Sequence, residues 1–167
     1  VIIHLLKAGK IDFGLINMTY YDEQLVFRSI MEIQDCFAAG DKYRHLSAKM
    51  QPLSEIVKHP LLLLEQASNS RVYIDQYFLN HSIAVSPAFE LGNMDLLVQF
   101  ARFDLGIACV IRNFIEEELE TGRLYEIKPI QPIPPREIGV TWRKDVPLSN
   151  ASQNLISLLE FNDTSEI

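Results

Sequence analysis

The sequence predicts an α/β protein built around a parallel sheet. Two stretches carry this prediction, because each alternates a short apolar strand with a helix. The first is Leu61–Glu65, after which a polar stretch opens a helix. The second is Pro87–Leu124, whose pattern indicates a strand, a capped helix, a buried strand and a second helix. Strands that alternate with helices are joined by crossovers, which favour parallel pairing.

Length and composition bound the protein class. At 167 residues the chain can form one core or two small lobes, and 48% hydrophobic with 22% charged residues is ordinary for a soluble globular protein. The net charge of −7 and the scattered basic residues argue against direct nucleic-acid binding by this segment. Leu61–Leu64 is too short to cross a bilayer and no signal peptide is visible, so we expect a cytoplasmic protein without a membrane partner.

The first third of the chain predicts the end of a helix followed by three strands. Gly9 stops the helix, and a buried strand spans Lys10–Asn17. Leu25–Met31 and Gln34–Ala39 indicate two more strands. A short helix over Pro52–Val57 ends before the next proline, because the residue preceding a proline disfavours helical geometry.

The helix that follows Leu61–Glu65 has one apolar face, formed by Tyr73, Ile74, Tyr77 and Phe78. In the next unit, Asn93 is expected to cap a helix, and Asp104 to adopt the left-handed conformation after it. Gly106–Ile111 is apolar throughout, as expected of a strand covered on both faces. Asn113 and Glu116 match a variant capping box for the second helix.

The last third predicts a strand, an extended segment, a strand and a helix. Gly122 ends the preceding helix, and Leu124–Ile127 forms the first strand. Prolines between residues 129 and 135 keep the next segment extended. Ile138–Trp142 is a strand, and Ser149 caps the last helix.

Support for catalysis is absent from the sequence patterns. Cys36 and Cys109 lie in separate apolar runs and are interpreted as buried thiols rather than a disulfide or metal pair. The four histidines lack metal-ligand spacing, and no nucleophile-elbow, P-loop or zinc-protease motif occurs. Asp12 is interpreted as a structural hydrogen-bond acceptor. We therefore predict no enzyme activity, no cofactor and no metal.

Three segments resemble the effector-binding (substrate-binding) domain of LysR-type transcriptional regulators. Leu6–Leu15, LKAGKIDFGL, is similar to the family segment L-x-x-G-x-(L/I)-D-x-(G/A)-(I/L). Val140–Arg143 resembles the late family strand L-x-W-R. Pro87–Leu124 has the family's order of elements, although its turn Arg102–Gly106 keeps only the last of two usual glycines.

The resemblance implies two Rossmann-like α/β lobes joined by two crossover strands, as in type II periplasmic binding proteins. Lobe I would comprise residues 1–38 and 133–167, and lobe II residues 39–132. The family's lobe I begins with a strand, a helix and a strand that have no counterpart here. We therefore expect an incomplete lobe I and a chain truncated on its N-terminal side.

Candidate site residues follow from the rule that ligands bind beyond the carboxyl ends of parallel strands, against helix N-termini. The resemblance places the same positions at the family's effector cleft. They are Ser68, Asn69, Ser70, Asn93, Met94 and Asn17. A helix start of this kind suits a carboxylate or another small anion. The alternative is that these residues only cap helices. Arg71 could pair with an anion or lie exposed on a solvated face.

The resemblance implies an effector-sensing domain of a LysR-type regulator. A small molecule, with an anion as one candidate, would bind between the lobes and modulate DNA binding by a winged helix-turn-helix domain absent from this chain. Expected partners are the effector and further copies, as a dimer or tetramer, with DNA contacted only through the missing domain. The alternative is a type II solute-binding protein serving transport, and the sequence upstream of Val1 would separate the two.

Overall fold

The computed structural model describes residues 2–17 and 22–159, which form two α/β units, as predicted. Unit 1 draws its described residues from Val1–Ile33 and Pro135–Ile167, and unit 2 comprises Gln34–Pro134. The chain passes between the units twice, once at residues 33–34 and once at 134–135. The lobe boundaries drawn from the sequence, at residues 38/39 and 132/133, stay a prediction.

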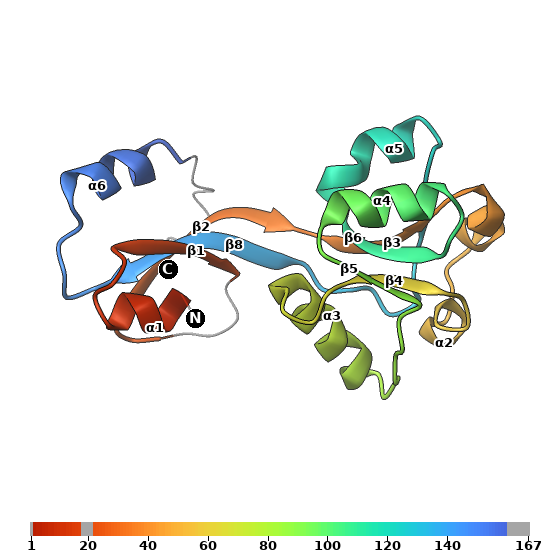
Figure 1. Cartoon of the computed structure of the whole chain (residues 1–167), viewed down its shortest axis with the longest axis horizontal. Helices are drawn as coiled ribbons and strands as arrows, with labels where there is room; N and C mark the ends of the chain where they lie inside the picture. The colour runs from red at the N-terminus through yellow and green to blue at the C-terminus, as the bar shows by residue number, and fades with distance from the viewer. Residues whose placement is uncertain (1, 18–21, 160–167) are drawn as a thin grey trace. The chain divides into compact units, whose positions relative to one another are not determined.

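Unit 1 contains a three-stranded antiparallel sheet in the order β1-β8-β2 (Figure 1). Its elements are α1 (Ile2–Lys7), β1 (Phe13–Asn17), β2 (Leu25–Ile33), β8 (Arg136–Arg143) and α6 (Asn150–Ser157). Gly9 ends α1 in the left-handed conformation, with φ +65°, which glycine adopts without strain. β1 begins at Phe13 rather than at the predicted Lys10, because the chain still turns out of α1 before that point.

Unit 2 is organised around a five-stranded mixed sheet in the order β5-β4-β6-β3-β7. β4 pairs in parallel with β5 and β6, as the strand–helix alternation predicts, whereas β3 runs antiparallel to β6 and β7. The elements are β3 (Asp35–Ala39), η1 (Asp41–Ala48), α2 (Leu53–Ile56), β4 (Leu61–Leu64), α3 (Asn69–Asn80), β5 (Phe89–Leu91), α4 (Met94–Arg102), β6 (Ile107–Ile111), η2 (Arg112–Ile115), α5 (Glu116–Glu120) and β7 (Tyr125–Ile127).

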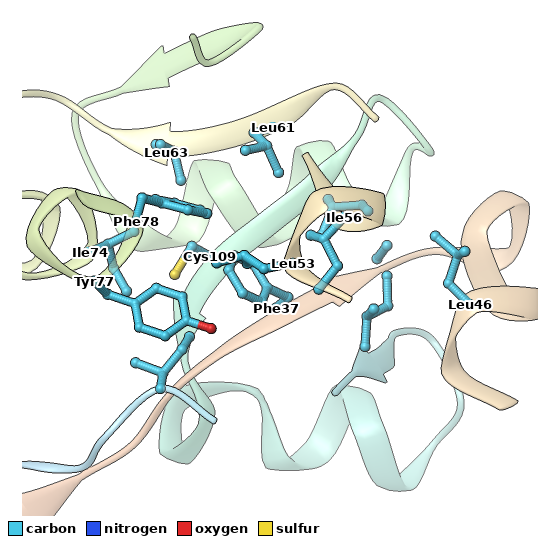
Figure 2. Close-up of a cluster of buried hydrophobic side chains, with 14 of the residues drawn as sticks. Phe37, Leu46, Leu53, Ile56, Leu61, Leu63, Ile74, Tyr77, Phe78 and Cys109 are labelled. Carbon is cyan, nitrogen blue, oxygen red and sulfur yellow. The ribbon is translucent and has the colours of Figure 1, made fainter. Parts of the chain in front are cut away.

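The sheet of unit 2 is covered on both faces. Alternate residues of β3 point to opposite sides, so Phe37 joins one apolar cluster and Cys36 the other. Side chains of η1, α2 and α3 complete the first cluster, and side chains of α4, η2 and α5 complete the second. Figure 2 shows the first cluster, in which Phe37 packs against Tyr77 and Phe78 with ring centroids 6.5 and 5.9 Å apart. All of β6 is buried, as its continuous apolar sequence predicts.

The start and end of α4 follow from their local sequence. The Leu96 amide donates to the Asn93 side-chain oxygen at 2.9 Å, which confirms the predicted cap. Asp104 has φ +60°, as predicted, and its carboxylate accepts from the Lys42 amide at 3.0 Å. This contact beyond its own turn helps to stabilise a conformation that non-glycine residues rarely adopt.

Two local expectations differ from the structure. The predicted capping box at Asn113 is wrong, because residues 112–115 form the short 3₁₀ helix η2 and α5 starts only at Glu116 without a side-chain cap. The 3₁₀ helix η1 was not predicted, since its sequence is polar and lacks a helical apolar stripe. Tyr43 and Leu46 nevertheless anchor it in the first cluster.

Candidate functional site

The start of α3 forms the first part of the candidate site. β4 ends at Leu64, and a turn closed by the Ser68 amide donating to the Glu65 carbonyl at 3.0 Å leads into the helix. Ser68 occupies the N-cap with extended geometry, φ −74° and ψ 133°, and its hydroxyl makes no capping hydrogen bond within the described chain. The first backbone N–H groups of a helix have no intrahelical acceptor, and here they accompany a hydroxyl not used in capping.

The start of α4 forms the second part. Asn93 is exposed, and its side-chain oxygen is used by the cap of its own helix. Met94 is half-buried and lines a small depression together with Ser70. Its volume is about 10 Å³, roughly the room that one ordered water requires. The remaining lining residues are Asp35, Leu63, Leu64, Arg71, Ile74 and Cys109.

The structure thus brings Ser70 and Met94 to one depression, with Ser68 and Asn69 beside it in sequence. Asn17 ends β1 in unit 1, where it pairs with Ile138 and is half-buried. Its contribution to the same site stays a prediction, as do the binding roles of the other five residues.

Arg71 is buried, which contradicts the expectation of an exposed arginine on a solvated face. Only 5% of its side chain is exposed. Nε donates to Asp75 at 2.8 Å, and Nη1 donates to the Leu64 carbonyl at 2.8 Å and to Glu90 at 3.1 Å. Burial acts to lower the pKa of the guanidinium, but the hydrogen bonds to both carboxylates outweigh it, so the pKa is raised and Arg71 stays charged.

Sequence reasoning missed this role because one of the two carboxylates that bind Arg71, that of Glu90, lies on a different element. Asp75 is one helical turn from Arg71 and could have been recognised as an i, i+4 pair. Glu90 is 19 residues away, and only the parallel pairing of β5 with β4 brings it close. No local pattern encodes that approach.

A larger pocket lies in unit 1 and includes none of the predicted residues. Its volume is about 490 Å³, and charged side chains dominate its lining. Two of its cations already pair with carboxylates, Lys7 with Asp22 and Arg143 with Asp145, both at 2.6 Å. Because internal ion pairs neutralise these cations, we place the candidate site in unit 2 rather than in the larger pocket.

The other chemically reactive groups have structural roles. Cys36 and Cys109 are buried, as predicted, and form no disulfide within the described chain; burial raises the pKa of the Cys36 thiol. Asp12 accepts hydrogen bonds from the hydroxyls of Ser149 and Ser152, both at 3.1 Å, which confirms its predicted structural role.

Neither a metal-binding cluster nor a membrane-spanning helix occurs in the described chain. Across residues 2–17 and 22–159, no three His, Cys, Asp or Glu side chains gather in a way that could hold a metal ion. No helix of the described chain has the length and apolarity needed to cross a membrane.

Comparison with known proteins identifies the family. A family model described as the LysR substrate binding domain matches residues 1–162. The uncharacterized HTH-type transcriptional regulator YeiE of Escherichia coli strain K12 is 30% identical over 160 residues, which cover 95% of this chain and 53% of that protein. The chain spans about half the length of the curated relatives it matches.

Solved structures share the fold. The regulatory domain of CcmR from Synechocystis PCC6803, in complex with 2-PG, has a TM-score of 0.79 at 18% identity and covers 95% of this chain and 76% of that one. The effector-binding domain of QuiR, in complex with shikimate, has a TM-score of 0.71 at 18% identity and covers 91% and 71%. These matches are regulatory domains rather than enzymes, and the two-lobed α/β plan is that of type II periplasmic binding proteins. The chain belongs to the LysR substrate-binding domain family.

Proposed function

We propose that this chain is the effector-sensing domain of a LysR-type transcriptional regulator. In this proposal a small molecule binds at the helix starts of unit 2 and biases DNA binding by a winged helix-turn-helix domain outside this chain. The observation that carries the proposal is the start of α3, where the first backbone N–H groups, which have no acceptor within the helix, accompany the Ser68 hydroxyl not used in capping. Such a helix start favours a carboxylate, phosphate or sulfur oxyanion.

The depression beside this helix start adds a polar and an apolar side chain to the proposed site, and Asp35 also lines it. Ser70 contributes a hydroxyl, and Met94 contributes an adaptable apolar side chain. The depression accommodates a water-sized group rather than a ring. We therefore propose that unit 2 holds the polar end of the effector, and the role of Asn17 stays a prediction from the sequence.

The transport alternative requires an exported protein with the same fold. The family match to regulators favours sensing over transport. A winged helix-turn-helix encoded upstream of Val1 would support the regulator, whereas a signal peptide there would support transport.

A charge substitution at Asn69 tests the binding site. Asn69→Asp keeps the side-chain shape and places a carboxylate in the first turn of α3, where the helix dipole tolerates it, so the fold should be retained. The same carboxylate should repel an anion. Asn113→Asp, on an exposed residue of η2, is the matched control.

The measurement uses the full-length regulator and named probes. The probes titrated at constant ionic strength are acetate, sulfate, phosphate, 2-PG and shikimate, and the shift of the thermal midpoint reports binding. We expect Asn69→Asp to abolish the shift and the ligand's effect on operator binding, while operator affinity without ligand is unchanged. An Asn69→Asp variant that responds like Asn113→Asp would contradict the site.

We further propose that the domain contacts DNA only through the helix-turn-helix domain and associates with copies of itself. With a net charge of −7, the chain itself is expected not to bind DNA at physiological salt, and robust binding by this segment would overturn that assignment. We propose self-association as a dimer or tetramer in the cytoplasm, for which sedimentation of the full-length protein is the direct measurement.

A further inference from the structure

Arg71 links the three elements that surround the candidate site. Its guanidinium contacts the last residue of β4 through the Leu64 carbonyl, the next turn of α3 through Asp75, and β5 through Glu90. Nε and Nη1 are therefore already engaged by two carboxylates and a carbonyl. These two nitrogens are not available to a ligand, although the side chain lies in the lining of the depression.

β5 is the shortest and most exposed of the three elements. It has three residues, lies at the edge of the sheet and, within the described chain, pairs only with β4; Phe89 and Glu90 are exposed. Gly92 follows, with no atom within 4 Å of where a side chain would begin, and Asn93 then caps α4. The Arg71–Glu90 ion pair thus joins the start of α3 to the strand that leads into the start of α4.

We infer that Arg71 is a positioning residue that sets the spacing between the two helix starts of the candidate site. This inference rests on the proposed function. Nε and Nη1 of Arg71 hold these surrounding elements rather than the ligand. Arg71 orients Ser68–Ser70 relative to Asn93 and Met94, because a rigid guanidinium fork with three acceptors allows one arrangement of β4, α3 and β5.

Arg71→Lys separates positioning from charge. The ammonium keeps the positive charge beside Asp75 and Glu90, but a point charge on a flexible stem does not reproduce a planar fork that serves three acceptors. Arg123→Lys is the matched control, since Arg123 also pairs with two carboxylates, Glu117 at 2.6 Å and Glu118 at 3.8 Å, away from the candidate site.

The first measurement needs no ligand. Amide hydrogen exchange in the full-length protein measures two local hydrogen bonds. The Leu96 amide donates to the Asn93 side chain, and the Glu65 amide donates to the Leu91 carbonyl of β5. The Val72 amide, bonded to Ser68 within α3, is the internal reference. Arg71→Lys should speed exchange at Leu96 and Glu65 about tenfold relative to Val72, the scale of losing one charged hydrogen bond. Arg123→Lys should leave the ratio unchanged.

The second measurement titrates sulfate and follows the Ser70 amide by NMR. The sulfate Kd should rise roughly tenfold in Arg71→Lys, the scale seen when the supporting partner of a binding group is removed. A merely structural arginine would lower the thermal midpoint while the folded protein kept its sulfate affinity and its exchange ratio, and that result overturns the inference. If the wild type does not bind sulfate at Ser70, the anion site of the proposed function is wrong. In that case the hydrogen-exchange ratios still test the positioning role of Arg71, and unchanged ratios in Arg71→Lys would contradict it.

Discussion

Helices α3 and α6 both begin with a serine at the N-cap, yet the two serines make different contacts. In unit 1 the Ser149 hydroxyl accepts from the Ser152 amide at 3.2 Å and donates to Asp12. In unit 2 Ser68 has similar extended geometry, but its hydroxyl makes no capping bond within the described chain. The same residue type at the same position therefore caps a helix through its side chain in one unit and makes no such cap in the other.

The bodies of the two helices explain the difference. α3 buries Ile74, Tyr77 and Phe78 in the first apolar cluster of unit 2, so packing stabilises it. α6 buries only Ser152 and Ile156, so it depends more on its cap. A helix that is stabilised by its buried face does not need a side-chain cap at its N-terminus. The backbone N–H groups there can then bind a ligand.

The largest expected effect is on the anchor of α3. Phe78 is 1% exposed and packs against Phe37 and Tyr77, so Phe78→Ala should lower the free energy of unfolding of unit 2 by about 3–5 kcal/mol. Phe114→Ala, on a residue that is 67% exposed, is the matched control and should change it by less than about 0.5 kcal/mol. Urea unfolding followed by circular dichroism measures both. Equal effects would mean that α3 does not depend on this core.

The next effect concerns Tyr77 and pH. Burial raises the pKa of Tyr77 to about 12, from about 10 in an unfolded chain. The folded state therefore favours the neutral phenol, and this contribution is complete below pH 10 and is lost as the pH rises from 10 to 12. The loss should reach about 2 kcal/mol. Tyr77→Phe does not titrate, so the wild type should lose stability relative to this variant over that range.

The stability difference between the wild type and Tyr77→Phe at pH 7 is the control for the alkaline measurement. The Tyr77 hydroxyl donates to the Gln131 carbonyl at 2.6 Å, and Gln131 is exposed, so water can replace the lost donor. Tyr77→Phe should therefore cost only about 1 kcal/mol at pH 7. Parallel pH profiles of the two proteins above pH 10 would contradict a buried phenol.

The sequence predicted the parts of the fold that depend on local chemistry. The cap at Asn93, the left-handed turn at Asp104 and the buried strand at Gly106–Ile111 follow from residue type and periodicity. The role of Arg71 could not be predicted, because its acceptors are brought together only by the parallel pairing of β4 and β5. The absence of a capping bond from the Ser68 hydroxyl could not be predicted either, because Ser149 is also a serine before a helix and does form a cap.

The cap of α6 gives the next smaller effect. Ser149→Ala removes the acceptor for the Ser152 amide and one donor to Asp12, so the free energy of unfolding should fall by about 1 kcal/mol. Ser149→Thr keeps a capping hydroxyl and should retain most of the stability. Urea titrations of the three proteins measure the difference. A Ser149→Ala variant as stable as the wild type would show that α6 does not need its cap.

The smallest expected change in stability is the most informative one for function. Ser68→Ala removes a hydroxyl that makes no capping bond, so the free energy of unfolding should change by less than about 0.5 kcal/mol. Sulfate binding should weaken in the same variant, because a donor at the start of α3 is lost. Ser149→Ala should show the opposite pattern, with reduced stability and unchanged sulfate affinity. If Ser68→Ala instead destabilises the protein as much as Ser149→Ala does, the Ser68 hydroxyl caps α3 in solution and is not free for a ligand.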